Sequence, residues 1–157
     1  MRIEDDRTVS GLRRSPFTTL TDEEIEHLSA EIRTIGADES VFMFNNGDKT
    51  SYVDAIDVIN VRYDVFPNTN STHPRDLMSQ RAVLAHEYFG HRVNRGTKLQ
   101  SGSWNDEFRA SYQAAKNTPN LSAEDRRYLV LDAMERAKES GVSIRPNNFM
   151  RRIIYGF

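Results

Sequence analysis

Apolar residues recur at helical spacing in several stretches of the chain, and this pattern predicts most of its secondary structure. The first stretch opens with Thr21-Asp22-Glu23-Glu24, which has the spacing of a helix capping box, and it ends at Gly36. Further helices are expected for residues 75–95, for 104–117 and for 123–140. Ser103 and Ser122 stand where N-caps of the last two helices belong.

A different periodicity marks residues 40–66. The apolar run 41–44 is followed by Asn45-Asn46-Gly47-Asp48, a sequence typical of a tight turn. Apolar and polar residues then alternate from Ile59 to Val65, as in a half-buried strand. We expect two or three strands here, with at least one antiparallel pair because the first turn is short. The predicted fold class is α+β, with a small antiparallel or mixed sheet packed against a helical bundle.

The length of 157 residues fits a single domain, which we place at residues 20–157. Residues 1–19 are polar and lack periodicity, so we expect a flexible leader. No apolar stretch approaches the roughly 20 residues that span a bilayer, and the N-terminus has no apolar signal core. The expected location is therefore cytoplasmic, with no membrane partner.

Charge and cysteine content narrow the candidate chemistry. The formal net charge of −2 argues against nucleic acid as a partner, because such binding usually needs a surplus of basic residues. The absence of cysteine excludes disulfides, thiolate metal sites and cysteine nucleophiles. Any transition-metal site must use His, Asp and Glu. The candidate imidazoles are His27, His73, His86 and His91.

The segment His86-Glu87-Tyr88-Phe89-Gly90-His91 resembles a zinc-hydrolase helix with one residue too many. In the common His-Glu-x-x-His motif, both histidines bind the metal from one helical face and the glutamate is the general base. At about 100° per residue, a spacing of five places the imidazoles about 140° apart. A π-bulge would absorb the extra residue and restore a common face. Gly90 would ease that distortion.

Spacing alone leaves two other interpretations open. Glu87 and His91 are four residues apart and share a face of a regular helix, which would make Glu87 a ligand. Alternatively, the segment is an ordinary helix with one satisfied core histidine and one surface histidine.

The motif is similar to the lengthened His-Glu-x-x-Gly-His motif of the dipeptidyl peptidase III family of zincin-type metallopeptidases. The family's second motif, Glu-Glu-x-Arg-Ala, resembles residues 106–110 here, with Asp106 in place of the first glutamate. The resemblance implies His86, His91 and Glu107 as zinc ligands and Glu87 as the catalytic base. Asp106 and His73 are the alternatives for the third ligand.

The resemblance covers residues 86–91 and 106–110, and the chain is far shorter than members of that family. It implies a zincin-like, gluzincin-type domain rather than a substrate. Small domains of similar scale occur in phage proteins and bacterial toxins, so delivery as part of a larger effector or phage protein is a second expectation.

The expected function is a zinc-dependent hydrolase, a metallopeptidase that acts on a peptide or protein. A strand edge in the 58–66 region would align an extended substrate. Arg109 is a candidate to orient Glu107, and a solvated charge is an equal alternative. Tyr112 is a candidate oxyanion donor, but a packed helical aromatic is the favoured interpretation. The alternatives are a metal-free helical interaction domain and an effector or toxin domain that acts on one specific target.

Overall fold

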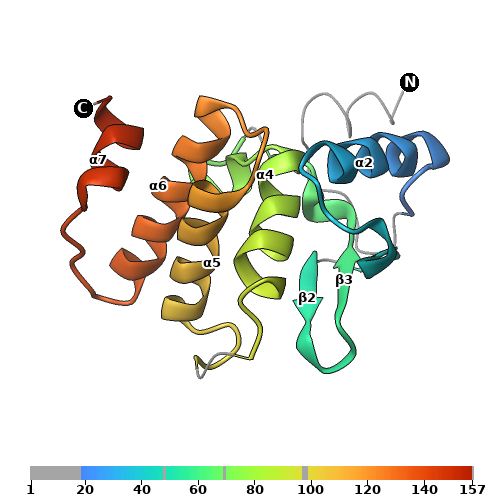
Figure 1. Cartoon of the computed structure of the whole chain (residues 1–157), viewed down its shortest axis with the longest axis horizontal. Coiled ribbons are helices and arrows are strands. Elements are labelled where there is room, and N and C mark those ends of the chain that lie inside the picture. Colours follow the sequence, from blue (N-terminus) through green and yellow to red (C-terminus); the bar gives the residue numbers. More distant parts are fainter. Residues whose placement is uncertain (1–18, 48, 69, 97–98, 157) are drawn as a thin grey trace.

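The computed structural model describes residues 19–47, 49–68, 70–96 and 99–156. The leader predicted for residues 1–19 therefore lies outside the described residues, apart from its last residue. The fold is α+β, with a small mixed sheet (Figure 1). In chain order the elements are helix α2 (Asp22–Thr34), 3₁₀-helix η2 (Glu39–Val41), strands β1 (Phe42–Phe44) and β2 (Ser51–Val53), 3₁₀-helix η3 (Asp54–Ile56), strand β3 (Val58–Val61), 3₁₀-helix η4 (Tyr63–Val65), helices α3 (Pro74–Leu77) and α4 (Gln80–Ala85), π-helix η5 (His86–Arg92), and helices α5 (Trp104–Asn117), α6 (Ala123–Glu139) and α7 (Asn148–Tyr155).

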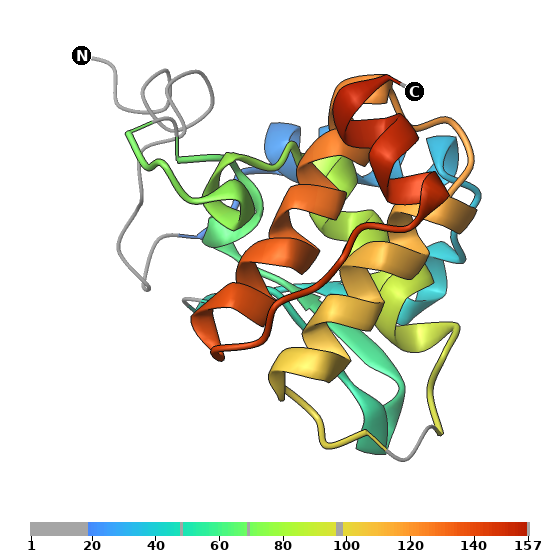
Figure 2. The same ribbon diagram turned by 90° about the vertical axis from the view of Figure 1, so that its left-hand side faces the viewer.

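The helices form a row beside the sheet. Figure 1 shows α7, α6, α5 and α4 in succession from left to right, with the sheet and α2 beyond them. In the perpendicular view of Figure 2, α5 and α6 run side by side, in agreement with the extensive packing between them. Helix α5 therefore lies between α6 and the α4–η5 segment. Among the described residues, no helix combines the length and apolar composition needed to cross a bilayer.

Helix α2 confirms the capping-box prediction. The Thr21 hydroxyl accepts a hydrogen bond from the Glu24 N–H, and the Glu24 carboxylate accepts one from the Thr21 N–H. Both donors would otherwise be unpaired at the start of the helix. Leu28 and Ile32 on the apolar stripe are fully buried, and Gly36 follows the helix with a φ of 75°. The stripe anchors α2 to the core because burial of each such side chain contributes about 1.5–3 kcal/mol.

The order of the strands corrects the expected hairpin. The order is β1-β3-β2, with β1 parallel to β3 and β2 antiparallel to β3. The run 41–44 therefore does not pair with the next strand across the short turn. Asn45 explains the difference, because its N–H donates to the Val61 carbonyl and its side-chain amide donates to Asn60. These bonds hold the end of β1 against β3.

The alternating pattern ends earlier than predicted. Ile59 and Val61 are fully buried on β3, as their spacing indicates, but residues 63–65 form the 3₁₀-helix η4. The Asp64 carboxylate accepts hydrogen bonds from the Thr50 N–H and hydroxyl, at 2.8 Å and 2.6 Å. This turn diverts the chain from the strand, so the period-2 pattern indicates burial here rather than pairing.

The helix predicted for residues 75–95 consists of three segments. Met78 has an extended backbone, and Ser79 caps a new helix by accepting a hydrogen bond from the Ala82 N–H. The chain continues from α4 directly into η5. The helices predicted for residues 104–117 and 123–140 are confirmed as α5 and α6, and their N-caps are Ser103 and Ser122.

Candidate metal centre

The turn that carries both candidate imidazoles is wound as a π-helix. Segment η5 covers His86–Arg92, and the Val93 N–H donates to the Tyr88 carbonyl five residues earlier. Such winding rotates each residue less than an α-helix does, so residues five apart lie on one face. The π-bulge expected from the spacing is confirmed, and the imidazole ring centroids of His86 and His91 lie 4.8 Å apart.

Gly90 permits the close approach of η5 to α5. A Cβ added at Gly90 would lie 2.4 Å from the carbonyl oxygen of Ala110 on α5. Neither backbone can move without disturbing the packing between these helices. The sequence interpretation, in which Gly90 eases the distorted winding, did not anticipate this contact. The glycine sets the distance between the helix that carries the imidazoles and the helix that carries Glu107.

Three donor side chains converge where η5 meets α5. Glu107 Oε1 lies 2.9 Å from His86 Nε2 and 3.3 Å from His91 Nε2. In a tetrahedral zinc site with bonds of about 2.0–2.2 Å, ligand atoms are roughly 3.3–3.5 Å apart. The donor set of two imidazoles and one carboxylate is also one that zinc prefers in catalytic sites. The three residues therefore fit a zinc ion after small side-chain adjustments.

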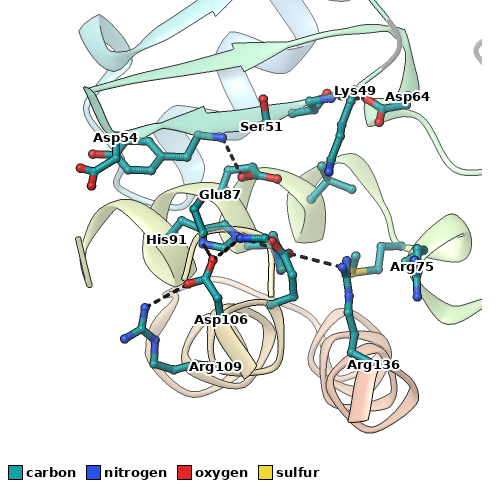
Figure 3. Close-up of a pocket in the computed structure, with 18 of the residues that line it drawn as sticks. Lys49, Ser51, Asp54, Asp64, Arg75, Glu87, His91, Asp106, Arg109 and Arg136 are labelled. Atoms are coloured by element: carbon teal, nitrogen blue, oxygen red, sulfur yellow. Dashed lines mark hydrogen bonds and ion pairs between the residues drawn. The ribbon is translucent and has the colours of Figure 1, made fainter. Parts of the chain in front are cut away.

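The Glu87 carboxylate bonds to the strand that lines the pocket opposite α5. Its carboxylate is buried and accepts a hydrogen bond of 3.0 Å from the backbone N–H of Tyr52 on β2. Figure 3 shows Glu87 between the strand that carries Ser51 and the level of His91. Donor atoms of Glu87, His86 and His91 also lie within 4.8 Å of one another. Glu87 thus lies beside the two imidazoles and is held by the Tyr52 N–H, whereas Glu107 is held by the imidazoles themselves.

Asp106 faces the other nitrogen of His91. Its Oδ2 lies 3.7 Å from His91 Nδ1, whereas Glu107 contacts Nε2. The same Oδ2 accepts a hydrogen bond of 3.0 Å from the Gly102 N–H. Donor atoms of His91, Asp106 and Glu107 lie within 4.8 Å of one another, so proximity alone permits Asp106 as a ligand. Its position behind the imidazole favours a supporting role for Asp106.

Three other residues considered in the sequence do not contact the donor cluster in the way expected. His73 Nε2 contacts Glu139 at 3.1 Å, and His73 does not line the pocket. Arg109 contacts Asp106, at 3.4 Å, rather than orienting Glu107 as expected. The Tyr112 hydroxyl accepts a hydrogen bond from the side-chain amide of Asn147, and Tyr112 does not line the pocket. Tyr112 packs against Phe108 and Phe149, as the interpretation of a packed helical aromatic expects, and does not reach the pocket as an oxyanion donor.

A buried polar chain behind the donors was missed in the sequence. His86 Nδ1 lies 2.8 Å from the Ser111 hydroxyl, which donates a hydrogen bond of 2.6 Å to Asp132 on α6. Arg136 contacts Asp132 at 3.2 Å and Glu107 at 3.4 Å. Two spacings indicate parts of this hydrogen-bonded network. Glu107 and Ser111 are four residues apart and share a helix face, and so do Asp132 and Arg136. The contact between α5 and α6 has no sequence signal.

Electrostatic interactions differentiate the carboxyl groups. Burial raises the pKa of Glu87, although the neighbouring His86 and His91 oppose this effect. Burial also acts to raise the pKa of Glu107, but hydrogen bonds from both imidazoles outweigh it and hold that pKa far below its usual range. Burial acts to lower the pKa of His91, but the hydrogen bond to Glu107 and the surrounding carboxylates raise it. Glu107 is therefore the anionic partner of the imidazoles, whereas Glu87 binds a proton more readily.

The cluster opens into a cavity of about 310 Å³. Residues 49–54, which include β2, line one side, and η5, α5 and α6 line the other. Among the described residues strand β2 pairs with β3 alone, so it is the sheet edge that faces the pocket. The expected edge in the 58–66 region is therefore wrong, because β3 is the central strand. Its inward residues make β3 part of the core rather than a binding edge.

Comparisons of this chain with protein-family models, with curated proteins and with solved structures find no match. The geometry of the described residues is therefore the basis of the functional interpretation that follows.

Proposed function

We propose that this chain is a zinc-dependent hydrolase that cleaves amide bonds in peptides or proteins. One observation carries the proposal: His86, His91 and Glu107 converge at an open cavity, and the Glu87 carboxylate lies beside them. Two imidazoles and a glutamate form the ligand set of some zinc peptidases, in which a fourth position stays open. When bound, zinc would act as a Lewis acid and lower the pKa of a water molecule from about 15.7 towards 7.

Glu87 is the proposed general base. The Tyr52 N–H holds Oε1 of Glu87, so the second carboxylate oxygen is available to take a proton from water. Burial raises the pKa of Glu87, which makes its carboxylate a stronger base than an exposed one. The same carboxyl group then delivers the proton to the leaving amine.

The substrate class follows from the strand on the opposite side of the cavity. Among the described residues strand β2 pairs with a neighbouring strand on one side, and on its other side the Tyr52 N–H donates to Glu87. Ser51, Tyr52 and Asp54 from this region line the pocket. An extended peptide can add to such an edge through backbone hydrogen bonds. This arrangement would place a peptide bond beside Glu87.

Matched glutamate variants test the proposed roles. The purified chain is expected to bind one zinc per molecule, measured by elemental analysis, and to cleave members of a quenched-fluorescence peptide library. Glu87→Gln is expected to retain zinc and lose cleavage, and Glu107→Gln is expected to lose zinc. Glu26→Gln makes the same change at an exposed position on α2 and should alter neither property. Zinc loss in Glu87→Gln would instead support Glu87 as a ligand.

A metal-free interaction domain is the competing function. The hydrogen bonds from both imidazoles to Glu107 would then serve stability alone. A chain that binds no zinc at micromolar concentration would support this alternative. Cleavage of one cellular protein, without activity on the library, would support an effector domain with a specific target.

A further inference from the structure

A buried carboxylate on α6 connects to two of the three proposed zinc ligands. The Asp132 side chain is fully buried. Among the described residues of α6, none belongs to the groups of His, Asp and Glu that could ligate a metal ion. One branch runs through Ser111 to His86, and the other runs through Arg136 to Glu107. We propose that Asp132 is a positioning residue that fixes the orientation of both ligands. This inference rests on the proposed function.

The direction of each hydrogen bond in the first branch follows from the number of available protons. Arg136 Nε lies 3.2 Å from both Asp132 carboxylate oxygens, as expected for an ionised carboxylate. Asp132 then only accepts, so the single hydroxyl proton of Ser111 points to Asp132. The Ser111 oxygen can satisfy His86 Nδ1 only as an acceptor. His86 therefore carries a proton on Nδ1, and its Nε2 faces Glu107, where a bound metal would replace the hydrogen bond between them.

The second branch acts on the carboxylate ligand. Arg136 lies 3.4 Å from Glu107 Oε1, the same oxygen that contacts both imidazoles. The guanidinium group is held in turn by Asp132, four residues earlier on the same helix. Arg136 thus restrains Glu107 from the side of α6. One buried group sets the orientation of ligands from both η5 and α5.

Outer groups of this kind typically change metal affinity by about 10–100-fold. Ser111→Ala and Asp132→Asn are therefore expected to weaken zinc binding by about 10–100-fold, measured by competition with a chromogenic chelator. Arg136→Gln and Ser111→Ala each cut one branch, so both effects should be smaller than that of Asp132→Asn, which removes the group that joins the two branches. Thr118→Val is the matched control: its buried hydroxyl has no hydrogen-bond partner among the described residues, and zinc affinity should not change.

A nuclear magnetic resonance measurement tests the branch without relying on zinc. Long-range ¹H–¹⁵N correlation should show the proton on His86 Nδ1 in the metal-free and zinc-loaded wild-type protein. That proton should exchange slowly with water, and faster in Ser111→Ala. A bare Nδ1 in the wild-type protein, or unchanged zinc affinity in folded Ser111→Ala, would overturn the inference.

The two proposals fail in different ways. A wild-type chain that binds no zinc but protects the Nδ1 proton through Ser111 would refute the metal site and retain the buried chain. Zinc affinity that is unchanged in Ser111→Ala and Asp132→Asn would refute the positioning role and retain the metal site. If Asp132→Asn does not fold, Ser111→Ala and the proton measurement still decide.

Discussion

The two sides of the pocket are built differently. On the helical side, formed by η5, α5 and α6, buried side chains bond to one another and to the donor cluster. On the strand side, formed by residues 49–54, the backbone N–H of Tyr52 donates the hydrogen bond that reaches Glu87 beside the cluster. The side-chain bonds of Thr50 go instead to Asp64 and Arg62, which hold the strand to its own sheet.

This difference separates two requirements of a metal-dependent site. Ligands must be fixed to within a fraction of an ångström, which packed and bonded side chains can achieve. Substrate alignment by a strand needs only backbone groups, which every residue but proline provides. Changes on the helical side should therefore alter metal binding, whereas changes on the strand side should alter stability or substrate binding.

Gly90→Ala should have the largest effect, because it separates the two helices of the helical side. The added methyl group would overlap the Ala110 carbonyl, and we expect a loss of about 3 kcal/mol or more in the free energy of unfolding. Urea denaturation would measure this loss, and zinc binding should fall with it. Gly96→Ala is the control, because Gly96 has open space but a φ of 83°, so a loss of about 1–2 kcal/mol is expected. Equal losses would contradict the packing argument.

Glu107→Gln tests the ligand assignment within the helical side. We expect zinc affinity to fall by more than about 100-fold. Loss of a residue that contacts a ligand, rather than the metal itself, typically lowers affinity by about 10–100-fold. Asp106→Asn makes the equivalent change next to it in the chain and should weaken zinc by about tenfold, because Asp106 faces Nδ1 of His91. Chelator competition measures both affinities. The reverse order would identify Asp106 as the ligand.

Thr50→Val tests the independence of the strand side. The Thr50 hydroxyl donates to Asp64 and accepts from the Arg62 N–H, so its loss should cost about 1–3 kcal/mol of stability. Zinc affinity should stay within about twofold, since these bonds do not reach the donor cluster. Thr118→Val provides the comparison, because it removes a buried hydroxyl that has no partner among the described residues. A large fall in zinc affinity of Thr50→Val would show that the two sides are coupled.

Tyr52→Phe should have the smallest effect. Burial and the hydrogen bond to Asp57 raise the pKa of Tyr52 to about 12. A raised pKa favours the folded protein below pH 10, and this contribution is lost as the pH rises from 10 to 12. Tyr52→Phe should remove from an ultraviolet titration a tyrosine that ionises near pH 12. Zinc content and cleavage should not change, because the backbone N–H that holds Glu87 remains. Loss of cleavage would indicate a direct role of the phenol group.

Local signals account for the parts of the fold that were predicted correctly. The N-caps Thr21, Ser103 and Ser122 determine where α2, α5 and α6 begin, because each side chain satisfies donors within three residues. The spacing of His86 and His91 allowed the π-turn to be predicted, because both imidazoles can share a face only if the helix is wound more loosely.

Signals were missing where contacts join distant segments. The sheet order depends on Asn45 bonding to residues 15 and more positions later, so the expected short hairpin did not form. The chain from His86 through Ser111 to Asp132 joins three elements, and each member alone resembles an ordinary helix residue. Arg109 is adjacent to the expected partner in sequence, but Arg136 contacts Glu107 in space.

The amino-acid sequence by itself determined the absence of thiol chemistry and where α2, α5 and α6 begin, because each start depends on neighbours within three residues. It offered the π-turn as one of three interpretations of the His86–His91 spacing. The tertiary structure decided which carboxylate faces the imidazoles, which strand forms the pocket edge and which buried group lies behind the ligands. These features depend on how closely η5, α5 and α6 pack, and no local pattern encodes that distance. Gly90 shows the reason: a residue without a side chain is needed there because the backbone of Ala110, twenty residues later in the sequence, lies against it.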